Sequence, residues 1–563
     1  MDQLQYNLKT IINDLYGIDV EPRVSVSDDE RRGDYTSNAA MQIAKQVGKA
    51  PAEIAAEIAE KMTDMKVEVA GPGFLNFTYP DKLLLEELKS ADEDFAGVFG
   101  YGKYAGKTVL TEFSDPNPFK VLHVGHLYTS LVGEAMSRLI EYAGGDVHRL
   151  NFGGDVGMHV AKAMYGMRQS MGGEFDFAKL PSGPLNERMD WIAKCYVEGT
   201  NAYEENEAEK TEIIEINKQV FKITTEDLRD SETAKIYWEC RTWSYEYFEE
   251  FYASVGVKFE KYYPESTVAV LGLETVKKHI GDVYTESDGA IVFVGEPYGL
   301  HTRVFINAAG IPTYEAKDVG LIMQKWADYH FDESIVVTAS DIIEYMKVVL
   351  KSVSMFEPEL PARTRHLTHG NVILPGGVKM SSRKGNFLRA TDVLGEVAEV
   401  QKKINGETNQ AVVLGAVKYA FLKSKVEPGT IVFDMEESVN LHGNSGPYLQ
   451  YSLARAKSIL RKLDDSTETE MMPLDAELDK WEKALIRALL DWKYSVRRAV
   501  DELAPHRICT YLYELAQIFS RFYENDKVVG GENEAVRRMI VEAYVAVLEK
   551  GLDILGIPSV ERI

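Results

Sequence analysis

Residues 108–140 have the sequence TVLTEFSDPNPFKVLHVGHLYTSLVGEAMSRLI, which predicts a strand, a turn and a helix in succession. The apolar run at 108–113 is typical of a strand, and a loop rich in Pro and Asn follows it. Residues 144–155, GGDVHRLNFGGD, predict a turn, a short strand and a second turn. Such a strand–turn–helix–strand order is a βαβ unit and indicates a parallel sheet. Apolar residues support the helix at helical spacing, at Leu127, Leu131, Ala135, Leu139 and Ile140.

The HVGH sequence at 123–126 lies between the predicted strand and the predicted helix. Free backbone N–H groups and the helix dipole favour an anion at such a helix start. We expect Gly125 to permit close approach of the backbone to a ligand. His123 and His126 can donate hydrogen bonds to phosphate oxygens, more strongly as charge builds in a transition state. The motif therefore predicts one half of an ATP site.

A second motif, KMSSRKG at 379–385, follows HGNVILPGGV and is expected on a loop after a strand. It concentrates the positive charges of Lys379, Arg383 and Lys384 beside two serine hydroxyls, with glycines on both sides. A cationic loop of this kind suits a leaving pyrophosphate, because it can close to neutralise charge and open to release product. Alone, the string would indicate only a basic surface loop.

Composition limits the class of protein. The chain has 563 residues, too many for one hydrophobic core, so three or four domains are expected. The formal net charge of −25 counts against a protein that coats nucleic acid non-specifically, but not against an enzyme with a local basic face. No secretory signal or membrane-spanning run is predicted. Three cysteines without a CxxC pair favour a reducing cytosol over a zinc ribbon or a disulfide framework.

The regions around this unit differ in pattern. Residues 1–80 predict a small α/β unit, with Thr36, Ser37 and Asn38 as candidate N-caps for one of its helices. Residues 171–250 are helical and highly charged, and their charge runs are interpreted as solvated helix faces of an insertion. Residues 290–295 and 303–307 predict sheet strands, whereas residues 391–563 are helical in pattern. The stripe formed by Trp481, Leu485, Leu489, Trp492 and Val496 predicts the core of a helical bundle rather than a base-stacking platform.

HxGH early in the chain and KMSxx late, around a parallel sheet, resemble the class I aminoacyl-tRNA synthetases. The flank TEFSDPNPFKVLHVGHLYTSLVGE is similar to the form of this motif in the arginyl-tRNA synthetase family. Further segments match that family in order along nearly the whole chain outside 171–250. They are GDYTSNAAMQIAK, VEVAGPGFLNF, NFGGD, YYPEST, IPTYEAKDVG, GAVKYAFL, HGNSGPYLQYSLARAKSIL, APHRICTYLYELAQIFSRFYENDKVV and GLDILGIPSVERI.

The resemblance implies an α/β fold. It comprises a Rossmann-like parallel-sheet catalytic domain, a small α/β N-terminal domain and an all-α C-terminal anticodon-binding bundle. The implied boundaries are 1–104 for the N-terminal domain, which contacts the tRNA elbow, and 105–390 for the catalytic domain with its insertion at about 171–250. Linker helices that contact the tRNA stem then span 391–430, and the anticodon-binding domain of the DALR type spans 431–563.

The resemblance also implies the activity of an arginine–tRNA ligase. Such an enzyme activates L-arginine with ATP, as its Mg²⁺ complex, to arginyl-adenylate and pyrophosphate. It then transfers arginine to the 3′-terminal adenosine of tRNA(Arg). No protein nucleophile and no structural metal are expected, and a cytoplasmic monomer without a membrane partner is the expected form.

Carried over residue by residue, the resemblance implies the site residues. A guanidinium is planar and always charged, so its pocket needs converging carboxylates; Glu112 and Asp318 match these positions. Asn117 matches the residue that holds the amino or carboxylate end of arginine, and Tyr314 the one that packs on the guanidinium. His123 is expected to contact arginine as well as ATP. The expected ATP-binding residues are His123, Gly125, His126, Lys379, Met380, Ser381, Ser382 and Lys384, and the expected catalytic residues are His123, His126, Lys120 and Lys379.

Lys120 has added importance, because Ser382 stands where many family members carry a second loop lysine. Other departures from the family pattern fall in the arginine and adenosine pockets. They are Asp115 in place of Ser, Val156 in place of Trp, Met158-His159 in place of Thr-Gln, Ala309-Gly310 in place of Asp-Gly, and SDIIEYM around residue 342 in place of a segment with Gln or His.

Three alternatives remain. A small-molecule adenylyltransferase or amino-acid ligase shares the HxGH fold, but the long helical region 391–563 favours a tRNA partner. A synthetase-like protein without catalysis, acting as an RNA-binding or regulatory module, is disfavoured by the intact HVGH and KMSSRKG motifs. Another class I specificity, such as lysine, also needs a carboxylate, but the helical-domain motifs indicate arginine.

Overall fold

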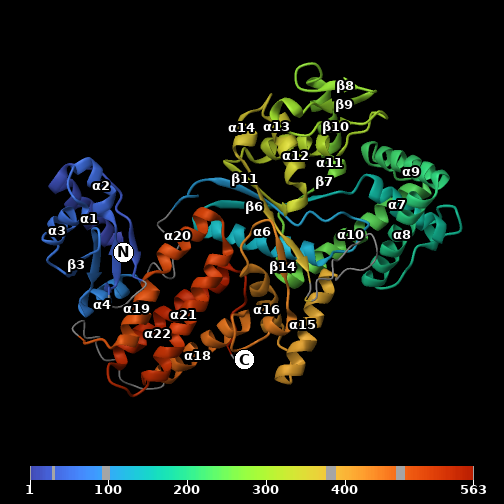
Figure 1. Cartoon of the computed structure of the whole chain (residues 1–563). Coiled ribbons are helices and arrows are strands. Elements are labelled where there is room, and N and C mark those ends of the chain that lie inside the picture. Colours follow the sequence, from blue (N-terminus) through green and yellow to red (C-terminus); the bar gives the residue numbers. More distant parts are fainter. Residues whose placement is uncertain are drawn as a thin grey trace.

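The computed structural model describes residues 2–27, 32–91, 102–373, 375, 389–464 and 476–561. Its centre is a parallel sheet with the strand order β12-β11-β5-β6-β7 (Figure 1). These strands are β5 (Thr108–Glu112), β6 (Asp146–Gly153), β7 (Lys261–Pro264), β11 (Glu333–Ala339) and β12 (Thr364–His369). The parallel sheet predicted from residues 108–155 is confirmed. The chain runs outward from β5 in both directions, and ligands of open α/β sheets bind where the strand order reverses in this way.

Helix α6 (Val124–Tyr142) connects β5 to β6 and starts inside the HVGH motif. It packs on β5, β6 and β11 with one side, and on helices of the C-terminal bundle with the other. A helix that buries residues all round in this way belongs to the interior of the protein. Its first turn is therefore held at the carboxyl end of β5 by the packing of two domains.

The segments at 290–295 and 303–307 form strands, as predicted, but they belong to a separate antiparallel sheet with the order β10-β9-β8. Its strands are β8 (Thr285–Ser287), β9 (Ala290–Phe293) and β10 (Arg303–Ile306). Helices α11 (Glu265–Lys278) and α12 (Tyr314–Tyr329) pack together beside it, and α13 (Ile343–Val353) and α14 (Glu359–Ala362) follow. Helix α12 begins at Tyr314, within the IPTYEAKDVG segment.

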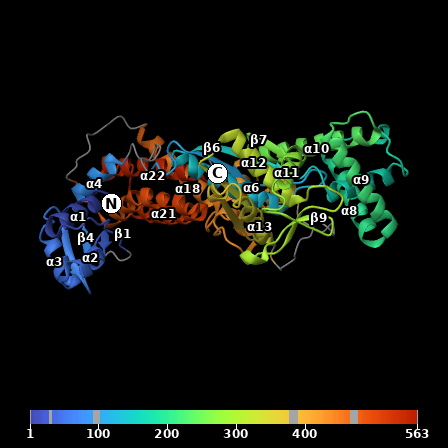
Figure 2. The same cartoon turned by 90° about the horizontal axis from the view of Figure 1, so that it is seen from above.

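The insertion consists of long helices at one end of the molecule (Figure 2). They are α7 (Met158–Ser170), α8 (Leu185–Glu205), α9 (Glu207–Thr225) and α10 (Glu232–Val255). The charged faces predicted to be solvated do lie outward, as the exposed side chains of α9 illustrate. Each helix also buries an apolar face; on α8 this face includes Met189, Ile192 and Tyr196. The insertion therefore has its own core and packs α8 against α7 and α10.

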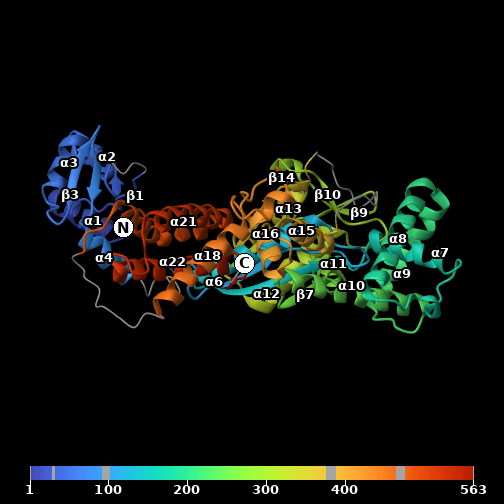
Figure 3. The ribbon, with the colours of Figure 1, turned by 90° about the horizontal axis from the view of Figure 1, so that it is seen from below.

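The N-terminal domain lies at the opposite end (Figure 3). Its antiparallel sheet has the order β1-β2-β4-β3, with strands β1 (Val24–Val26), β2 (Tyr35–Ser37), β3 (Lys66–Ala70) and β4 (Phe74–Thr78). Its helices are α1 (Asp2–Tyr16), α2 (Ala39–Val47), α3 (Pro51–Ala59) and α4 (Asp81–Ser90). Asn38 occupies the N-cap of α2 without a side-chain cap bond. Instead Ser37, at the end of β2, accepts the Ala39 N–H at 3.1 Å, while Thr36 lies within the strand.

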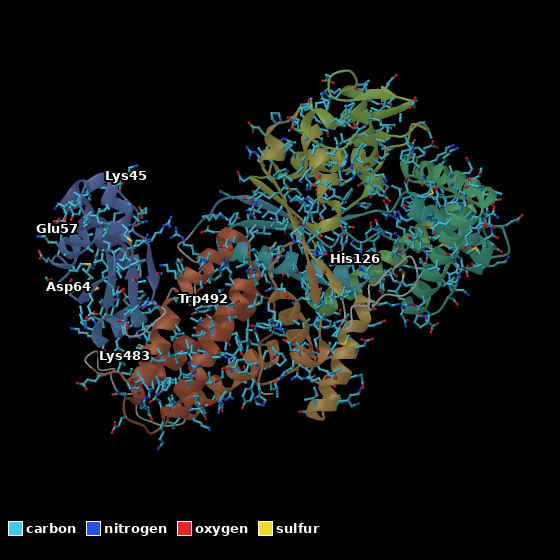
Figure 4. All side chains as sticks on the ribbon, viewed as in Figure 1. Lys45, Glu57, Asp64, His126, Lys483 and Trp492 are labelled. Atoms are coloured by element: carbon cyan, nitrogen blue, oxygen red, sulfur yellow. The ribbon has the colours of Figure 1, made fainter. Side chains whose placement is uncertain are left out.

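Two ion pairs join the N-terminal domain to the C-terminal bundle, the first between partly exposed side chains and the second with a buried carboxylate. The Lys483 ammonium, labelled in Figure 4, lies 2.7 Å from Asp81 of α4. The Arg487 guanidinium pairs with Asp34, whose side chain is fully buried. Both cations belong to α19 (Lys480–Leu490), which packs against α4. The two domains, far apart in sequence, therefore meet through one helix.

The C-terminal region is helical, as predicted, with one short strand, β14 (Thr430–Val432), that pairs in parallel with β13 (Asn371–Ile373). The predicted aromatic stripe is split between α19 and α20 (Trp492–Glu502), and Leu485, Leu489, Trp492 and Val496 are buried, so its core role is confirmed. No helix in the described part of the chain is long and apolar enough to cross a membrane. The remaining helices are α15 (Ala390–Asn405), α16 (Gln410–Leu422), α17 (Met435–Ser438), α18 (Gly446–Asp464), α21 (Pro505–Asn525) and α22 (Glu534–Ile554).

Candidate active site

The two histidines of HVGH cap helix α6. The N–H of Gly125 donates to His123 Nδ1 at 3.1 Å, and the N–H of His123 donates to His126 Nδ1 at 3.1 Å. The rings lie 3.9 Å apart, centroid to centroid. A Cβ on residue 125 would lie 2.9 Å from the His123 ring, so the glycine makes room for the imidazole.

This geometry engages two of the backbone N–H groups at the helix start that were expected to face an anion. The Gly125 N–H is engaged by His123, and the His126 N–H donates to the His123 carbonyl at 2.8 Å. Because each Nδ1 accepts a hydrogen bond, a neutral ring carries its proton on Nε2. The two Nε2–H groups are thus the ring donors that remain available to a ligand.

Both rings are held neutral. Burial, reinforced by the nearby Lys120 ammonium, lowers the pKa of His123 to about 4. Burial also lowers the pKa of His126 well below its usual range, and His123 and Lys120 add to the effect. At neutral pH these histidines donate hydrogen bonds as dipoles, while the positive charge beside them belongs to Lys120.

The chain that follows the distant KMSSRKG motif is joined to HVGH from Arg389 onward. Arg389, four residues after the motif, forms an antiparallel β-bridge with His123. The Ala390 N–H donates to the Leu122 carbonyl at 3.1 Å, and the Arg389 guanidinium pairs with Asp190 of α8. The candidate residues Lys379, Met380, Ser381, Ser382 and Lys384 themselves lie outside the described residues.

A cavity opens in front of the two histidines. Its lining brings together Asn117, Lys120, His123 and His126, four residues singled out from the sequence, with residues of α8. Glu112, Tyr314 and Asp318 are not part of this lining. They belong to a neighbouring cluster on β5 and α12, next to the segment that follows β6.

The loop between β5 and HVGH has an unusual backbone. Ser114, Asp115 and Phe119 all have positive φ, at 73°, 45° and 66°. Such non-glycine residues cost energy and need fixed surroundings. The Phe119 N–H donates to Ser244 at 3.0 Å, and Asp115 Oδ1 accepts the Phe152 N–H at 2.7 Å. These contacts, partly from α10 of the insertion, hold the loop that carries Asn117 and Lys120.

Asn117 lies against the turn that follows β6. A Cβ on Gly154 would lie 2.2 Å from Asn117 Oδ1, so only glycine fits there. The next residue, Asp155, is fully buried and receives the Ser266 N–H at 2.9 Å and the Arg241 guanidinium at 2.8 Å. The GGDVG turn therefore connects β6, α10 and α11, and its first two glycines lie beside the loop that carries Asn117.

Glu112 already has a partner inside the protein. Lys325 Nζ lies 2.7 Å from Glu112 Oε2 and 3.1 Å from the Ser334 hydroxyl, and both charged side chains are buried. The sequence-based expectation of Glu112 as a guanidinium ligand did not include this lysine. Lys325 lies seven residues after Asp318 on α12, a spacing that returns to the same helix face and could have indicated it.

Asp318 lies in the same buried cluster and accepts a hydrogen bond from the Tyr345 hydroxyl. Burial raises the pKa of Asp318 to about 8; the Tyr345 hydrogen bond opposes this rise and the nearby Glu112 carboxylate adds to it. Burial and Glu112 likewise raise the pKa of Asp115 well above its usual range. The cluster thus gathers the carboxyl groups of Glu112, Asp115 and Asp318 around Lys325, and a cation that entered it would favour ionisation of Asp318.

Tyr314 opens α12 four residues before Asp318, and the two differ in exposure. Tyr314 is 48% exposed, whereas Asp318 is 9% exposed. The Tyr314 hydroxyl lies 3.4 Å from His159 Nδ1, and His159 Nε2 donates to the Gly154 carbonyl at 2.6 Å. Tyr314 therefore stands at the open side of the cluster, and Asp318 at its base.

Sequence reasoning missed a second buried ion pair at the border of the two regions. Lys317 Nζ lies 2.5 Å from Glu265, the first residue of α11. A Cβ on Gly154 would also come within 3.1 Å of Glu265, so this pair adjoins Asn117. Glu265 belongs to the YYPEST segment, but no spacing in the sequence indicated Lys317 as its partner.

Comparisons with known proteins agree along the whole chain. A family model described as the class I tRNA synthetase (R) catalytic domain matches residues 99–438. The arginyl tRNA synthetase N-terminal domain matches 2–79, and the DALR anticodon binding domain matches 449–563. A protein of Bacteroides fragilis named arginine–tRNA ligase is 28% identical over 604 aligned positions, covering 100% of this chain and 99% of the relative. One of Treponema denticola with the same name is 30% identical, covering 82% and 80%.

Solved structures show the same fold. The arginyl-tRNA synthetase of Thermus thermophilus matches with a TM-score of 0.78 at 23% identity, covering 100% of both chains. That of Plasmodium falciparum matches with a TM-score of 0.77 at 19% identity, covering 100% of this chain and 99% of that one.

Proposed function

The chain belongs to the arginyl-tRNA synthetase family, and from this premise we propose which of its residues carry each part of the reaction. It is an arginine–tRNA ligase. In the first step a carboxylate oxygen of arginine attacks the α-phosphorus of ATP, and the bond to the pyrophosphate oxygen breaks. In the second step a hydroxyl of the terminal adenosine of tRNA(Arg) attacks the acyl carbon, and AMP leaves. Both are displacements in which positioning and charge stabilisation supply most of the rate.

We propose that ATP binds in front of HVGH with its phosphates toward the two Nε2–H groups. The main support for this proposal is the β-bridge between His123 and Arg389, because it joins the HVGH motif to the residues that follow KMSSRKG. Lys120 supplies positive charge from the loop before the helix. Lys379, Ser381, Ser382 and Lys384, with Met380 between them, complete the site from the other side.

ATP enters as its Mg²⁺ complex in this proposal. Mg²⁺ is commonly held by substrate phosphates with one or two carboxylates and several waters. In the described part of the chain no group of three His, Cys, Asp or Glu side chains is arranged to hold a metal ion.

We propose that arginine binds between the two regions of the site. Its guanidinium enters the acidic cluster, where it meets Asp318 and the Glu112 oxygen that Lys325 does not contact. Tyr314 covers the open side. Asn117 then holds the amino or carboxylate end near His123, which directs the carboxylate toward the α-phosphate. Lysine lacks the planar fork of donors that two carboxylates can bind together.

The proposed partners follow from the domains. The N-terminal domain, residues 1–104, contacts the tRNA elbow. The catalytic domain at 105–390 receives the acceptor end, residues 391–430 contact the stem, and residues 431–563 bind the anticodon side. A cytoplasmic monomer is the proposed form.

Exchange of labelled pyrophosphate into ATP tests the phosphate assignments, with arginine and tRNA(Arg) present. Substituting Lys120→Met removes one charged donor, and such losses cost about 10²- to 10³-fold in kcat. Lys351→Met is the matched control, because Lys351 also lies on a tyrosine ring, 4.4 Å from the centroid of Tyr298, but outside the site. Equal rates for both variants would refute the role of Lys120. Exchange supported by lysine and not by arginine would refute the pocket assignment.

A further inference from the structure

One helix of the insertion reaches the cavity at HVGH. Ala193, Tyr196 and Val197 of α8 line it together with Lys120 and the two histidines. Tyr196 is 8% exposed and belongs to the buried face of α8. Positions 190, 193 and 197 lie on one face of α8, because their spacing matches the helical period. The face that includes Ala193 and Val197 therefore also carries Asp190, which pairs with Arg389. The insertion is therefore part of the wall of the catalytic cavity.

The ring of Tyr196 lies under the side-chain ammonium of Lys120. Nζ is 4.7 Å from the ring centroid, within the range of a cation–π contact. The charge of Lys120 acts on the centre of the site, since it shifts the pKa values of His123, His126 and Glu265. The ammonium thus rests on an aromatic face while it points into the cavity.

Phosphate binding depends on whether the partner of Lys120 is an aromatic ring or a carboxylate. Nearby carboxylates have other cations: Glu265 pairs with Lys317, and Asp155 with Arg241. Among residues 102–373 and the other described ranges, no carboxylate lies within ion-pair distance of Lys120. A carboxylate would neutralise the ammonium and compete with phosphate for its N–H donors. An aromatic face attracts the cation and leaves both its charge and its donors available.

We propose that Tyr196 is a positioning residue for the adenylation step, which holds the Lys120 ammonium toward the phosphates of ATP through the face of its ring. This inference rests on the proposed role of Lys120. It gives the helical insertion a part in catalysis: α8 supplies the platform on which the phosphate-binding lysine is preorganised.

The test uses pyrophosphate exchange with the full chain, arginine and tRNA(Arg), and measures kcat and KM for ATP. Tyr196→Leu removes the π face, and we expect kcat/KM for ATP to fall about 3- to 30-fold, the range of a partly desolvated cation–π contact. Tyr196→Phe keeps the face and should retain wild-type values. Tyr203→Leu is the matched control: it lies two turns further along α8, where Lys162 is 4.3 Å from its ring centroid, and it should leave the exchange unchanged.

A double variant separates positioning from a loss of structure. If Tyr196 acts through Lys120, Tyr196→Leu causes no further loss in a Lys120→Met background. Additive losses, or a Phe variant as poor as Leu, would overturn the inference. Thermal unfolding of each variant shows whether it folds, and Tyr196→Met, which fills similar space without a π face, replaces Leu if needed. If Lys120→Met lowers the exchange rate and Tyr196→Leu does not, this inference alone is overturned. If Lys120→Met leaves the exchange rate unchanged, the assignment of Lys120 to the phosphates is overturned, and the inference about Tyr196 with it.

Discussion

Arginine binding should strengthen as the pH rises, because Asp318 must lose a proton to receive the guanidinium. In the free site burial raises the pKa of this carboxyl to about 8, and the Glu112 carboxylate contributes to the rise. The guanidinium of arginine stays charged throughout the range of interest. A protonated Asp318 offers it no negative charge, so protons and arginine compete for the same carboxylate.

The magnitude follows from the fraction of ionised Asp318. With a pKa of about 8, roughly one tenth of the molecules carry the carboxylate at pH 7 and about one hundredth at pH 6. The association constant should therefore fall about tenfold per pH unit below 8, which corresponds to about 1.4 kcal/mol per unit. Above pH 8 the dependence levels off. The direction of the pH dependence follows from the raised pKa of this carboxyl group. Arginine binding is weak at a pH below that pKa and reaches its full strength above it.

Isothermal titration of the full chain with L-arginine between pH 6 and 8.5 measures this dependence. Titrations in buffers of different ionisation enthalpy also count the protons, and we expect about 0.9 released per arginine at pH 7, given a pKa of about 8. Asp318→Asn preserves the shape of the side chain, and it should bind weakly with no such slope. A flat affinity in the native chain, or the same slope in Asp318→Asn, would refute the assignment of Asp318 to the guanidinium.

Three further predictions follow from buried groups. Because the pKa of His123 is lowered to about 4, pyrophosphate exchange at saturating arginine should show no inflection near pH 6.5; an inflection there that His123→Asn abolishes would contradict the neutral capping geometry. Lys325→Met leaves Glu112 buried without its partner, and breaking such pairs costs about 3–5 kcal/mol, so the unfolding temperature should fall and Glu112→Gln should restore much of it. Arg487→Met leaves Asp34 buried and unpaired at the contact of two domains; we expect faster protease cleavage of the N-terminal domain, and cleavage as slow as in the native chain would contradict the contact.

The parts of the fold near HVGH could be predicted because they depend on local pattern. The apolar run that begins at residue 108 and a 3.6-residue period from Leu127 onward predict a strand and a helix. The right-handed geometry of βαβ units then predicts that the next strand lies parallel to the first. The antiparallel sheet formed by β8, β9 and β10 was not specified, because strand patterns do not tell which partner a strand chooses. Its segments were found, but not its separate place in the fold.

The geometry of the site was harder to predict than the residues that form it. The sequence brought Asn117, Lys120, His123 and His126 to one loop and helix start, and the structure gathers them in one cavity. It did not show that the two imidazoles accept hydrogen bonds from backbone N–H groups of their own turn. A sequence motif does not indicate which acceptor a given N–H group will bind. Tyr196 lies in a charged insertion, and only the buried face of α8 distinguishes it from the surrounding helix surface.

In the proposed mechanism, the charges at the cavity predict that the lysines contribute more than the histidines to the departure of pyrophosphate. The capping contacts and burial keep both imidazoles neutral, so they contribute directed N–H dipoles but no net charge. A departing pyrophosphate accumulates negative charge, and full cations must supply the balance. In the resemblance to the family, Ser382 takes the place of a second loop lysine. In the proposed mechanism the missing positive charge comes from Lys120, whose ammonium lies on the Tyr196 ring and keeps its full charge available when the bond to pyrophosphate breaks.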